Sequence, residues 1–530
     1  ASGVLNAAQA TITQKGTTVA TIQLAVEKQN AINRILDATT GRSITLETLR
    51  KAGVTGIPTG VHASDILSVA QDVITKKGTT VATIQAVVDK RNAIIKLHDT
   101  TPQDSYGLTV DDFSKAGITG VTIANLQIAQ NSIMDVGTSI SDIQNDVDNP
   151  PVTRDELKTL INDYGNTLSA SILTKIENAN TRHITDMSWM FYSASEFNGD
   201  ISSWDVSNVN DMSNMFYDAS EFNGDISSWD VRNVNNMSSM FSSSAFNRDL
   251  SSWDIGNVIN MSDMFSNAKA FNQDLSNWNV SHVRDMSGMF SSSVFNQDLS
   301  SWDISNVINM SDMFSNAKAF NQDLSNWDVS RVRDMSGMFG NAKAFNQDLS
   351  SWDVSSVRNM SGMFGNAKAF NQDLSTWDVS SVIDMSGMFT DASGFNGDIS
   401  SWDVSNVKNM SYMFYGASIF NGDISSWDVS NVKNMSGMFE ETKKFNADIS
   451  SWNVGRVTDM SDMFYFAFVF NRNISSWDVG NVIDMSGMFF SAYNFNVDIS
   501  RWDVGSVVDM ECMLENVPQS LSSWNIVCNP

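Results

Sequence analysis

The chain has 530 residues, which is long enough for several ordinary domains or for one extended array of repeats. Its formal net charge of −27 excludes a nucleic-acid binder, because neutralising a phosphate backbone requires clustered Lys and Arg, and it favours cations as ligands. No apolar stretch is long enough for a membrane span, and the chain opens at Ala1, as a processed product would, without a basic segment and a following apolar run.

The first part of the chain repeats at long range. GTTVATIQLAVEKQNAI begins at Gly16, GTTVATIQAVVDKRNAI begins at Gly78, and a degenerate copy, GTSISDIQNDVD, begins at Gly137. Between these copies, ITLETLRKAGVTGI (44–57) recurs as LTVDDFSKAGITGV (108–121). The Thr-Thr pairs are typical of helix N-caps, and the Lys-Ala-Gly segments are typical of helix ends.

These signals predict tandem all-α helical bundles, with one module at 1–62 and one or more at 63–149. The units resemble the small three-helix modules of large bacterial surface proteins, and this resemblance covers residues 1–149. Two prolines then break the pattern at 150 and 151, and VTRDELKTLINDYGNTLSASILTKIENA predicts one or two further helices. We therefore expect 150–186 to be a helical linker and the N-terminal cap of the array that follows.

The composition changes near residue 180. All 15 Trp and 28 of the 29 Met follow it. The first 180 residues contain 15 basic and 18 acidic residues, net −3, which leaves 18 basic and 42 acidic residues, net −24, for the remainder. Nearly all of the negative charge therefore belongs to the second part of the chain.

The second part consists of tandem repeats. Successive repeats are 25 residues apart, or 24 in two cases, as marked by the Trp residues 204, 229, 253, 278, 302, 327, 352, 377, 402, 427, 452, 477 and 502. Its consensus is F-N-x-D-[IL]-S-x-W-D-V-S-x-V-x-[DN]-M-S-x-M-F-x-x-A-x-x. Alternation from Ile201 to Val206 predicts a short strand, and apolar spacings of three and four from Val209 to Phe222 predict a helical turn. The expected fold class is thus α+β: helical bundles, then a right-handed leucine-rich-repeat-like solenoid at 187–510 with a C-terminal cap at 511–530.

Several columns of the repeat have structural interpretations. The Trp and Met columns lie in the apolar frame and are predicted to form the core. The Asn that follows Phe, from Asn198 to Asn496, is predicted to satisfy backbone groups at a turn. The Asp or Asn before Met, such as Asp211 and Asn236, is predicted to be a helix N-cap.

The Asp that follows Trp is predicted to face solvent, since it lies between two buried residues of the expected strand. The column consists of Asp205, Asp230, Asp254, Asp303, Asp328, Asp353, Asp378, Asp403, Asp428, Asp478 and Asp503. Neighbouring carboxylates about 5 Å apart repel each other by roughly 1 kcal/mol in water. Two interpretations remain open: specific calcium sites, since calcium takes oxygen ligands, or a solvated acidic face.

One further column alternates between cations and apolar residues, and it lies between the buried Val and the Asp or Asn before Met. Its members are Ile259, Arg284, Ile308, Arg333, Arg358, Ile383, Lys408, Lys433, Ile483 and Val508. A solvent-facing column would not usually contain so many Ile and Val. It therefore indicates either a docking edge for another copy of the chain or side chains packed locally between coils.

The remaining chemistry-bearing residues are few. Cys512 and Cys528 are the two cysteines and could form a disulfide, which is weak evidence for an oxidising compartment. The four histidines, His62, His98, His183 and His282, lie far apart in the sequence, and no metalloprotease, P-loop or nucleophile-elbow motif is present. The sequence therefore predicts a protein that is not an enzyme.

The repeat string WDVSNVxxMSxMFxxAxxFNxDIS is very similar to the bacterial surface protein 26-residue repeat family, which is related to BspA-like leucine-rich repeats and to lipoprotein-type repeats of mycoplasmas. The resemblance covers residues 187–526 and implies a secreted or cell-surface protein that acts in adhesion. The candidate functions are a self-assembling fibre, sheath or surface-layer subunit, a monomeric adhesin that binds a host or neighbouring cell, and a phage tail-fibre-like receptor-binding protein. The expected partners are copies of the chain, other surface proteins or a host receptor.

Overall fold

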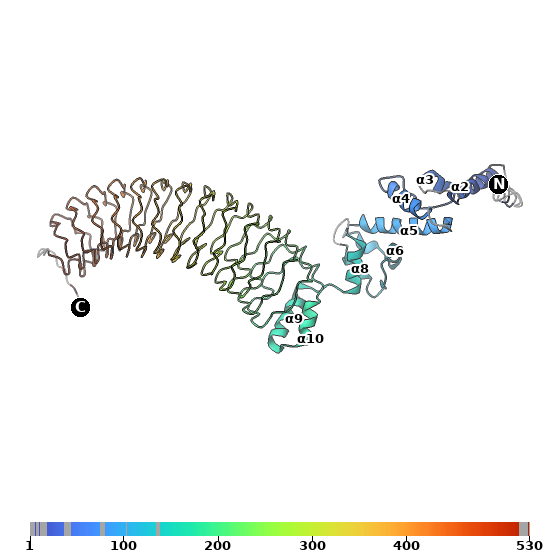
Figure 1. The fold of residues 1–530 in the computed structure, drawn as a ribbon, viewed down its shortest axis with the longest axis horizontal. Helices are drawn as coiled ribbons and strands as arrows, with labels where there is room; N and C mark the ends of the chain where they lie inside the picture. Colours follow the sequence, from blue (N-terminus) through green and yellow to red (C-terminus); the bar gives the residue numbers. More distant parts are fainter. Residues whose placement is uncertain are drawn as a thin grey trace. The chain divides into compact units, whose positions relative to one another are not determined.

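The computed structural model describes residues 6, 10, 19–36, 44–74, 80–101, 103–133, 138–518 and 528. The chain divides into two compact units, Ala1–Pro151 and Val152–Pro530, which are described separately here. Figure 1 shows helices in the first unit and a stack of similar coils in the second.

The first unit is helical and has two apolar cores. Its helices are α2 (Val19–Leu36), α3 (Leu46–Lys51), α4 (Ala63–Ile74), α5 (Val81–His98), the 3-10 turn η2 (Ser105–Gly107), α6 (Val110–Ala116), α7 (Leu126–Asn131) and α8 (Ile140–Asp148). Ile84 and Val88 of α5 belong to the first core, with residues of α2, α3 and α4. Ala93 and Leu97 of the same helix belong to the second core, with residues of α6, α7 and α8. One long helix is therefore shared by both bundles.

The predicted helix ends of this unit are confirmed where the structure describes them. The Thr80 side chain accepts a hydrogen bond from the Thr83 N–H and caps α5. Both Lys-Ala-Gly segments end a helix, with φ of 93° at Gly53 and 98° at Gly117, in the left-handed region that glycine adopts readily. The Thr pair at 17 and 18, Thr79, and the glycines 16, 78 and 137 lie outside the described residues.

Successive repeats of the first unit are joined by one recurring contact. The Gln85 side chain accepts from the N–H of Thr55 (2.7 Å) and donates to its carbonyl (3.2 Å). Gln144 makes the same pair of hydrogen bonds with Thr119, at 2.7 and 3.1 Å. The Gln of one repeat thus satisfies the loop backbone of the preceding repeat.

The second unit begins with two helices that cover the first coil, α9 (Arg154–Thr167) and α10 (Ala170–Glu177). Leu157 and Ile161 of α9 and Ile176 of α10 are buried in the same core as the coils. Lys158 of α9 donates from Nζ to the carbonyls of Trp189 (2.6 Å) and Met190 (2.8 Å). These helices therefore bury the apolar side chains of the end coil and satisfy its exposed carbonyl groups.

Each coil contains three pentapeptides that start with Asp or Asn, have apolar residues second and fifth, and usually have Ser third, such as 200–204, 205–209 and 211–215. In each of them the first side chain accepts the N–H of the third residue through Oδ1, at 3.0, 3.0 and 2.8 Å. The N–H of the fifth residue donates to the carbonyl of the second, at 3.1, 2.9 and 3.2 Å. An Asx turn and a β-turn thus bend the chain three times while both apolar residues face the core.

These turns show that the strand expected from Ile201 to Val206 is wrong, since the chain turns between Ile201 and Trp204. The expected N-cap role of Asp211 and Asn236 is also wrong, because these residues form Asx turns and no helix follows them. No strand occurs anywhere in the described residues. The expected α+β class and the leucine-rich-repeat-like solenoid with a strand in each coil are therefore incorrect.

The helical turn expected from Val209 to Phe222 is wrong as well. Asn214 and Asp218 have φ of 56°, in the left-handed region, and the same two columns have positive φ in every coil. A left-handed residue cannot continue a right-handed helix, so the apolar spacing of three and four is produced by consecutive turns. Most residues in these columns are Gly, Asn, Asp or Ser, the types that tolerate this conformation or favour turns.

Neighbouring coils are held in register by main-chain hydrogen bonds. Single-residue parallel bridges connect the Asp or Asn before Met in each coil to the same residue in the next, from Asp186 and Asp211 to Asp484 and Asp509. The segment after the bridge donates every second N–H to the next coil, as from Phe191 to the Met215 carbonyl at 2.8 Å. The coils are therefore stacked by a narrow hydrogen-bonded strip and not by a sheet.

Side chains connect the coils at two further columns. Each repeat Trp from Trp229 onward donates its indole N–H to a carbonyl of the preceding coil, as from Trp352 to Leu324 at 3.0 Å, and Trp204 donates to Ile176 of α10. Each Asn after Phe accepts the N–H of the next Asn in its column, as Asn321 accepts from Asn346 at 2.9 Å. The predictions of a Trp and Met core and of an Asn column that satisfies backbone groups are confirmed.

The ring columns indicate why the coil stack in Figure 1 is curved. Centroids are 5.7 Å apart between Phe364 and Phe389, 6.1 Å between Phe345 and Phe370, and 6.5 Å between Trp352 and Trp377. Hydrogen-bonded backbones are only about 4.8 Å apart. The coils are thus closest along the bridged strip and most separated along the Trp column, so the stack bends towards the strip.

Two glycines of the positive-φ column that includes Asn214 provide a matched test of how neighbouring coils pack. Gly337 and Gly362 have φ of 61° and 62°, but a Cβ at Gly337 would meet the carboxylate of Asp312, whereas at Gly362 the nearest atom is 4.0 Å away. Gly362→Ala should cost about 1 kcal/mol of unfolding free energy through backbone strain alone. Gly337→Ala should cost roughly 1–3 kcal/mol more because of the added clash. Denaturant unfolding measures both.

The control for this test is the double variant Asp312→Ala with Gly337→Ala. Removing the carboxylate vacates the space that the new Cβ needs, so the Gly337 substitution should cost about as much in this background as at Gly362. Equal costs for the two single variants would contradict the packing described for this column.

Candidate functional site

The alternating column is exposed along the bridged strip. Each member donates its N–H to the carbonyl at the same position of the preceding coil, as Arg284 to Ile259 (2.8 Å) and Ile308 to Arg284 (2.9 Å), so the backbone is fixed at a constant pitch. The exposed fraction is 47% for Ile259, 39% for Ile308 and 50% for Ile483. The structure therefore places apolar side chains of this column at the surface of the coil stack.

The cations of this column have no partner within the described part of the chain. Neither an ion pair nor a side-chain hydrogen bond is formed by the five basic members Arg284, Arg333, Arg358, Lys408 and Lys433. All of them are exposed. The column thus combines unpaired positive charge with exposed isoleucine on a unit whose net charge is strongly negative.

The Asp column after Trp is used by the fold itself. Asp328 accepts the N–H of Ser330 at 3.0 Å, and the other members accept from the residue two positions later in the same way. A hydrogen bond from the Ser side chain, followed by the one from its backbone, lowers the pKa of Asp328, Asp378 and Asp428. One oxygen of each carboxylate is therefore committed to a local turn.

The described residues include no group of three or more His, Cys, Asp or Glu side chains arranged to hold a metal ion. The second carboxylate oxygen of Asp230 is already paired, since it accepts from the guanidinium of Arg232 at 2.6 Å. Calcium binding along this column stays a prediction, beside the interpretation as a solvated acidic face.

A cluster of carboxylates from neighbouring coils was not predicted from the sequence. Burial, and then the charges of Asp462 and Glu441, raise the pKa of Glu440 to about 7. Burial also raises the pKa of Asp462, with Asp484 and Asp459 adding to the shift. The irregular segment EETKKFN at 440–446 was the available signal, but Asp462 comes from the next coil.

Glu440 should make stability depend on pH. Its pKa in the folded chain is about 7, above the ordinary 4.5, so the folded state retains the proton more strongly than the unfolded state. The stabilisation is complete below pH 4.5 and is lost as the pH rises through about 7. Glu440→Gln cannot ionise at this position, so the stability of the parent relative to this variant should decrease as the pH rises from 5 to 8.

The measurement is the free energy of unfolding of both proteins in denaturant from pH 5 to pH 8. Glu196→Gln changes an exposed carboxylate on another coil and is the control. A difference between parent and Glu440→Gln that does not vary with pH would show that Glu440 is ionised throughout this range.

The histidines and cysteines are placed as follows. His62 and His98 lie far apart in the sequence, but both contact Asp99, with Nε2 of His62 at 2.8 Å and Nδ1 of His98 at 3.1 Å from its oxygens. His183 and His282 belong to the second unit. Cys512 and Cys528 form a disulfide. None of the described helices is long and apolar enough to cross a membrane.

The geometry defines a repeat protein made of stacked coils with exposed, regularly spaced columns. One family model matches the coils in five overlapping segments, 160–278, 242–351, 271–375, 341–452 and 444–527, and its description is "Mycoplasma protein of unknown function, DUF285". The chain belongs to this Mycoplasma repeat family. No curated protein matches the chain.

Proposed function

We propose that the chain is a non-enzymatic, extracellular surface protein that associates with copies of itself through the alternating column of its coil stack. The similarity of the repeat to bacterial surface protein 26-residue repeats, BspA-like repeats and mycoplasma lipoprotein-type repeats supports the surface location. The observation that carries self-association is the alternating column, with exposed Ile and unpaired cations at one-coil pitch.

The energetics favour an acidic partner surface. Exposed isoleucines such as Ile259, Ile308 and Ile383 gain about 25 cal/mol for each Å² of apolar surface removed from water. The cations between them attract carboxylates, and the second unit carries two exposed Asp columns of the same pitch, after Trp and before Ile or Leu.

The partner is therefore a second copy of this chain. Equal spacing lets the cations of one stack meet successive Asp residues of another stack without any change in backbone. A contact between two different faces is heterologous and need not close, so it can extend into a fibre or layer. A monomeric adhesin that uses the same column for a receptor is the alternative outcome of the test below.

The test replaces three isoleucines of the column together, Ile259→Glu, Ile308→Glu and Ile383→Glu. Each carboxylate removes apolar contact and repels the opposing Asp column, so the association constant should fall by at least tenfold, which corresponds to about 1.4 kcal/mol. The melting temperature should stay within a few degrees of the parent value, because these side chains are exposed. Sedimentation velocity over a range of protein concentration measures the association.

The control is Ile419→Glu with Tyr493→Glu, two residues that are 45% and 52% exposed but lie outside the column. It should associate like the parent protein. If the parent sediments as a monomer at all concentrations, self-association is wrong and the adhesin alternative takes its place. If the control also loses association, the column is not the contact surface.

A further inference from the structure

The two 24-residue repeats lose their residue at one defined place. Ordinary coils place five residues between the two stacked phenylalanines, as between Phe314 and Phe320, whereas a short coil places four, as between Phe290 and Phe295. Ring centroids are 3.8 Å apart in the first pair and 4.0 Å in the second, so the core is unchanged. The deletion therefore alters only the outer surface of the turn.

A serine hydroxyl closes the shortened turn. In an ordinary coil the N–H of Phe320 donates to the Ala317 carbonyl at 3.1 Å. In the short coil Ser293 replaces the alanine, donates from Oγ to the Phe290 carbonyl (2.8 Å) and accepts the N–H of Phe295 (3.3 Å). The Ser293 hydroxyl thus takes the place of the alanine carbonyl as acceptor for the phenylalanine N–H, so this N–H stays satisfied in the shortened turn.

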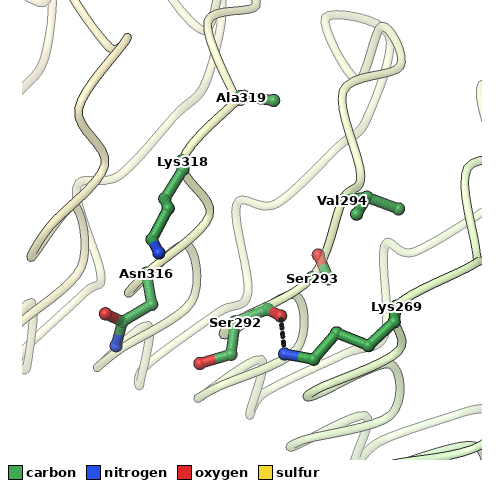
Figure 2. A pocket seen from close by; sticks show the side chains of 7 residues that line it. All are labelled: Lys269, Ser292, Ser293, Val294, Asn316, Lys318 and Ala319. Carbon is green, nitrogen blue, oxygen red and sulfur yellow. Dashed lines mark hydrogen bonds between the residues drawn. The ribbon is translucent and has the colours of Figure 1, made fainter.

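The shortened turn leaves a recess of about 410 Å³ on the surface. Figure 2 shows its lining, with Lys269 on one side, residues 292–294 in the middle and Asn316 and Lys318 on the other side. Lys269 donates from Nζ to the Ser292 carbonyl at 3.0 Å. The Lys318 side chain, by contrast, has no hydrogen bond or ion pair within the described residues, and it is exposed.

An amide ladder ends at the same recess. Asn366 donates from Nδ2 to Oδ1 of Asn341 at 2.7 Å, and Asn341 donates to Asn316 in the same way. The coil before Asn316 has Ser292 at this position instead of Asn. The Nδ2 of Asn316 therefore keeps only a contact of 3.4 Å with the Ser315 hydroxyl. Amides in a chain polarise one another, which strengthens the terminal donor. The recess therefore presents two donors, an ammonium and an amide, and favours an anionic acceptor.

The surrounding face is basic, unlike the rest of the second unit. Between the second Met of the repeat and the Gln that follows Asn, the five coils from 264 to 372 contain four lysines, Lys269, Lys318, Lys343 and Lys368, and no Asp or Glu. The corresponding segment of a coil before this region contains Asp218 and Glu221, and that of the coil after it contains Asp391. Lys318, Lys343 and Lys368 thus form a row at one-coil pitch, and Lys269 lies two coils before Lys318, across the recess; these segments contain no carboxylate.

We propose that this row and its recess bind a linear saccharide that carries anionic groups. One coil advances by about 5 Å, comparable to the rise of one ring in an extended saccharide chain, so successive acidic groups can meet successive lysines. Ser hydroxyls and Asn and Gln amides beside the row can pair with sugar hydroxyls. No Phe, Tyr or Trp side chain is exposed among these five coils, and the whole chain carries −27, which disfavours single-stranded nucleic acid.

The experiment is titration calorimetry of the full chain with two oligosaccharides of equal length, one sulfated (a heparin hexasaccharide) and one carboxylated (an oligogalacturonate hexamer). Binding of either one supports the proposal, and the tighter of the two identifies the anionic group. The affinity should fall with added NaCl, because exposed ionic contacts are screened. Binding of neither, or tighter binding of single-stranded DNA than of both, overturns the proposal, as does binding of inorganic sulfate with equal affinity.

Two variants locate the site. Lys318→Ala, Lys343→Ala and Lys368→Ala together should weaken binding roughly thirtyfold, at about threefold for each exposed ionic contact. Val294→Trp should also weaken binding by filling the recess; because Val294 is 41% exposed, folding should be unaffected. Lys443→Ala with Lys444→Ala, two exposed lysines of a later coil, is the matched control. An unchanged affinity in the triple variant, or an equal loss in the control, contradicts the assignment.

Discussion

No coil of the second unit can bury its apolar residues alone, so the structure of this unit depends on stacking in strict register with the next coil. The bridged strip fixes that register, and each Trp indole then reaches a carbonyl one coil away, as Trp352 reaches Leu324 at 3.0 Å. Because the coils are in register, each residue lies beside the residue at the same position of the neighbouring coil. A polar side chain can therefore hydrogen-bond to that neighbour, as in the Asn column, without changing how the coils pack.

The same constraint governs how the coils can vary. A side chain in the left-handed column extends over the next coil, so Asp312 is followed by Gly337 and Tyr412 by Gly437. A deleted residue is tolerated where a Ser hydroxyl replaces the lost acceptor, as at Ser293. Both adjustments leave the buried rings in place, because changes are confined to turns at the surface. Function can therefore differ from coil to coil while the core is constant.

The two proposed binding features use different parts of this surface. The alternating column lies along the strip where the coils are closest, and it combines apolar and cationic side chains of the kind that dock against an acidic face. The lysine row lies beyond the second Phe of the repeat, where short and ordinary turns alternate and leave a recess. One stack can thus present both surfaces at once, since they belong to separate columns of the same coils.

The sequence by itself determined the period, the buried columns, the Asn column and the helix ends of the first unit, because each depends on residues that recur or that act locally. It did not determine the backbone of the coil: the spacing that suggested a strand and a helix arises from consecutive turns with left-handed residues. The Asp-apolar-Ser motif and the columns of Gly, Asn and Asp carried that information. The Glu440 cluster and the lysine recess were decided only by the tertiary structure, since each brings together side chains from different coils.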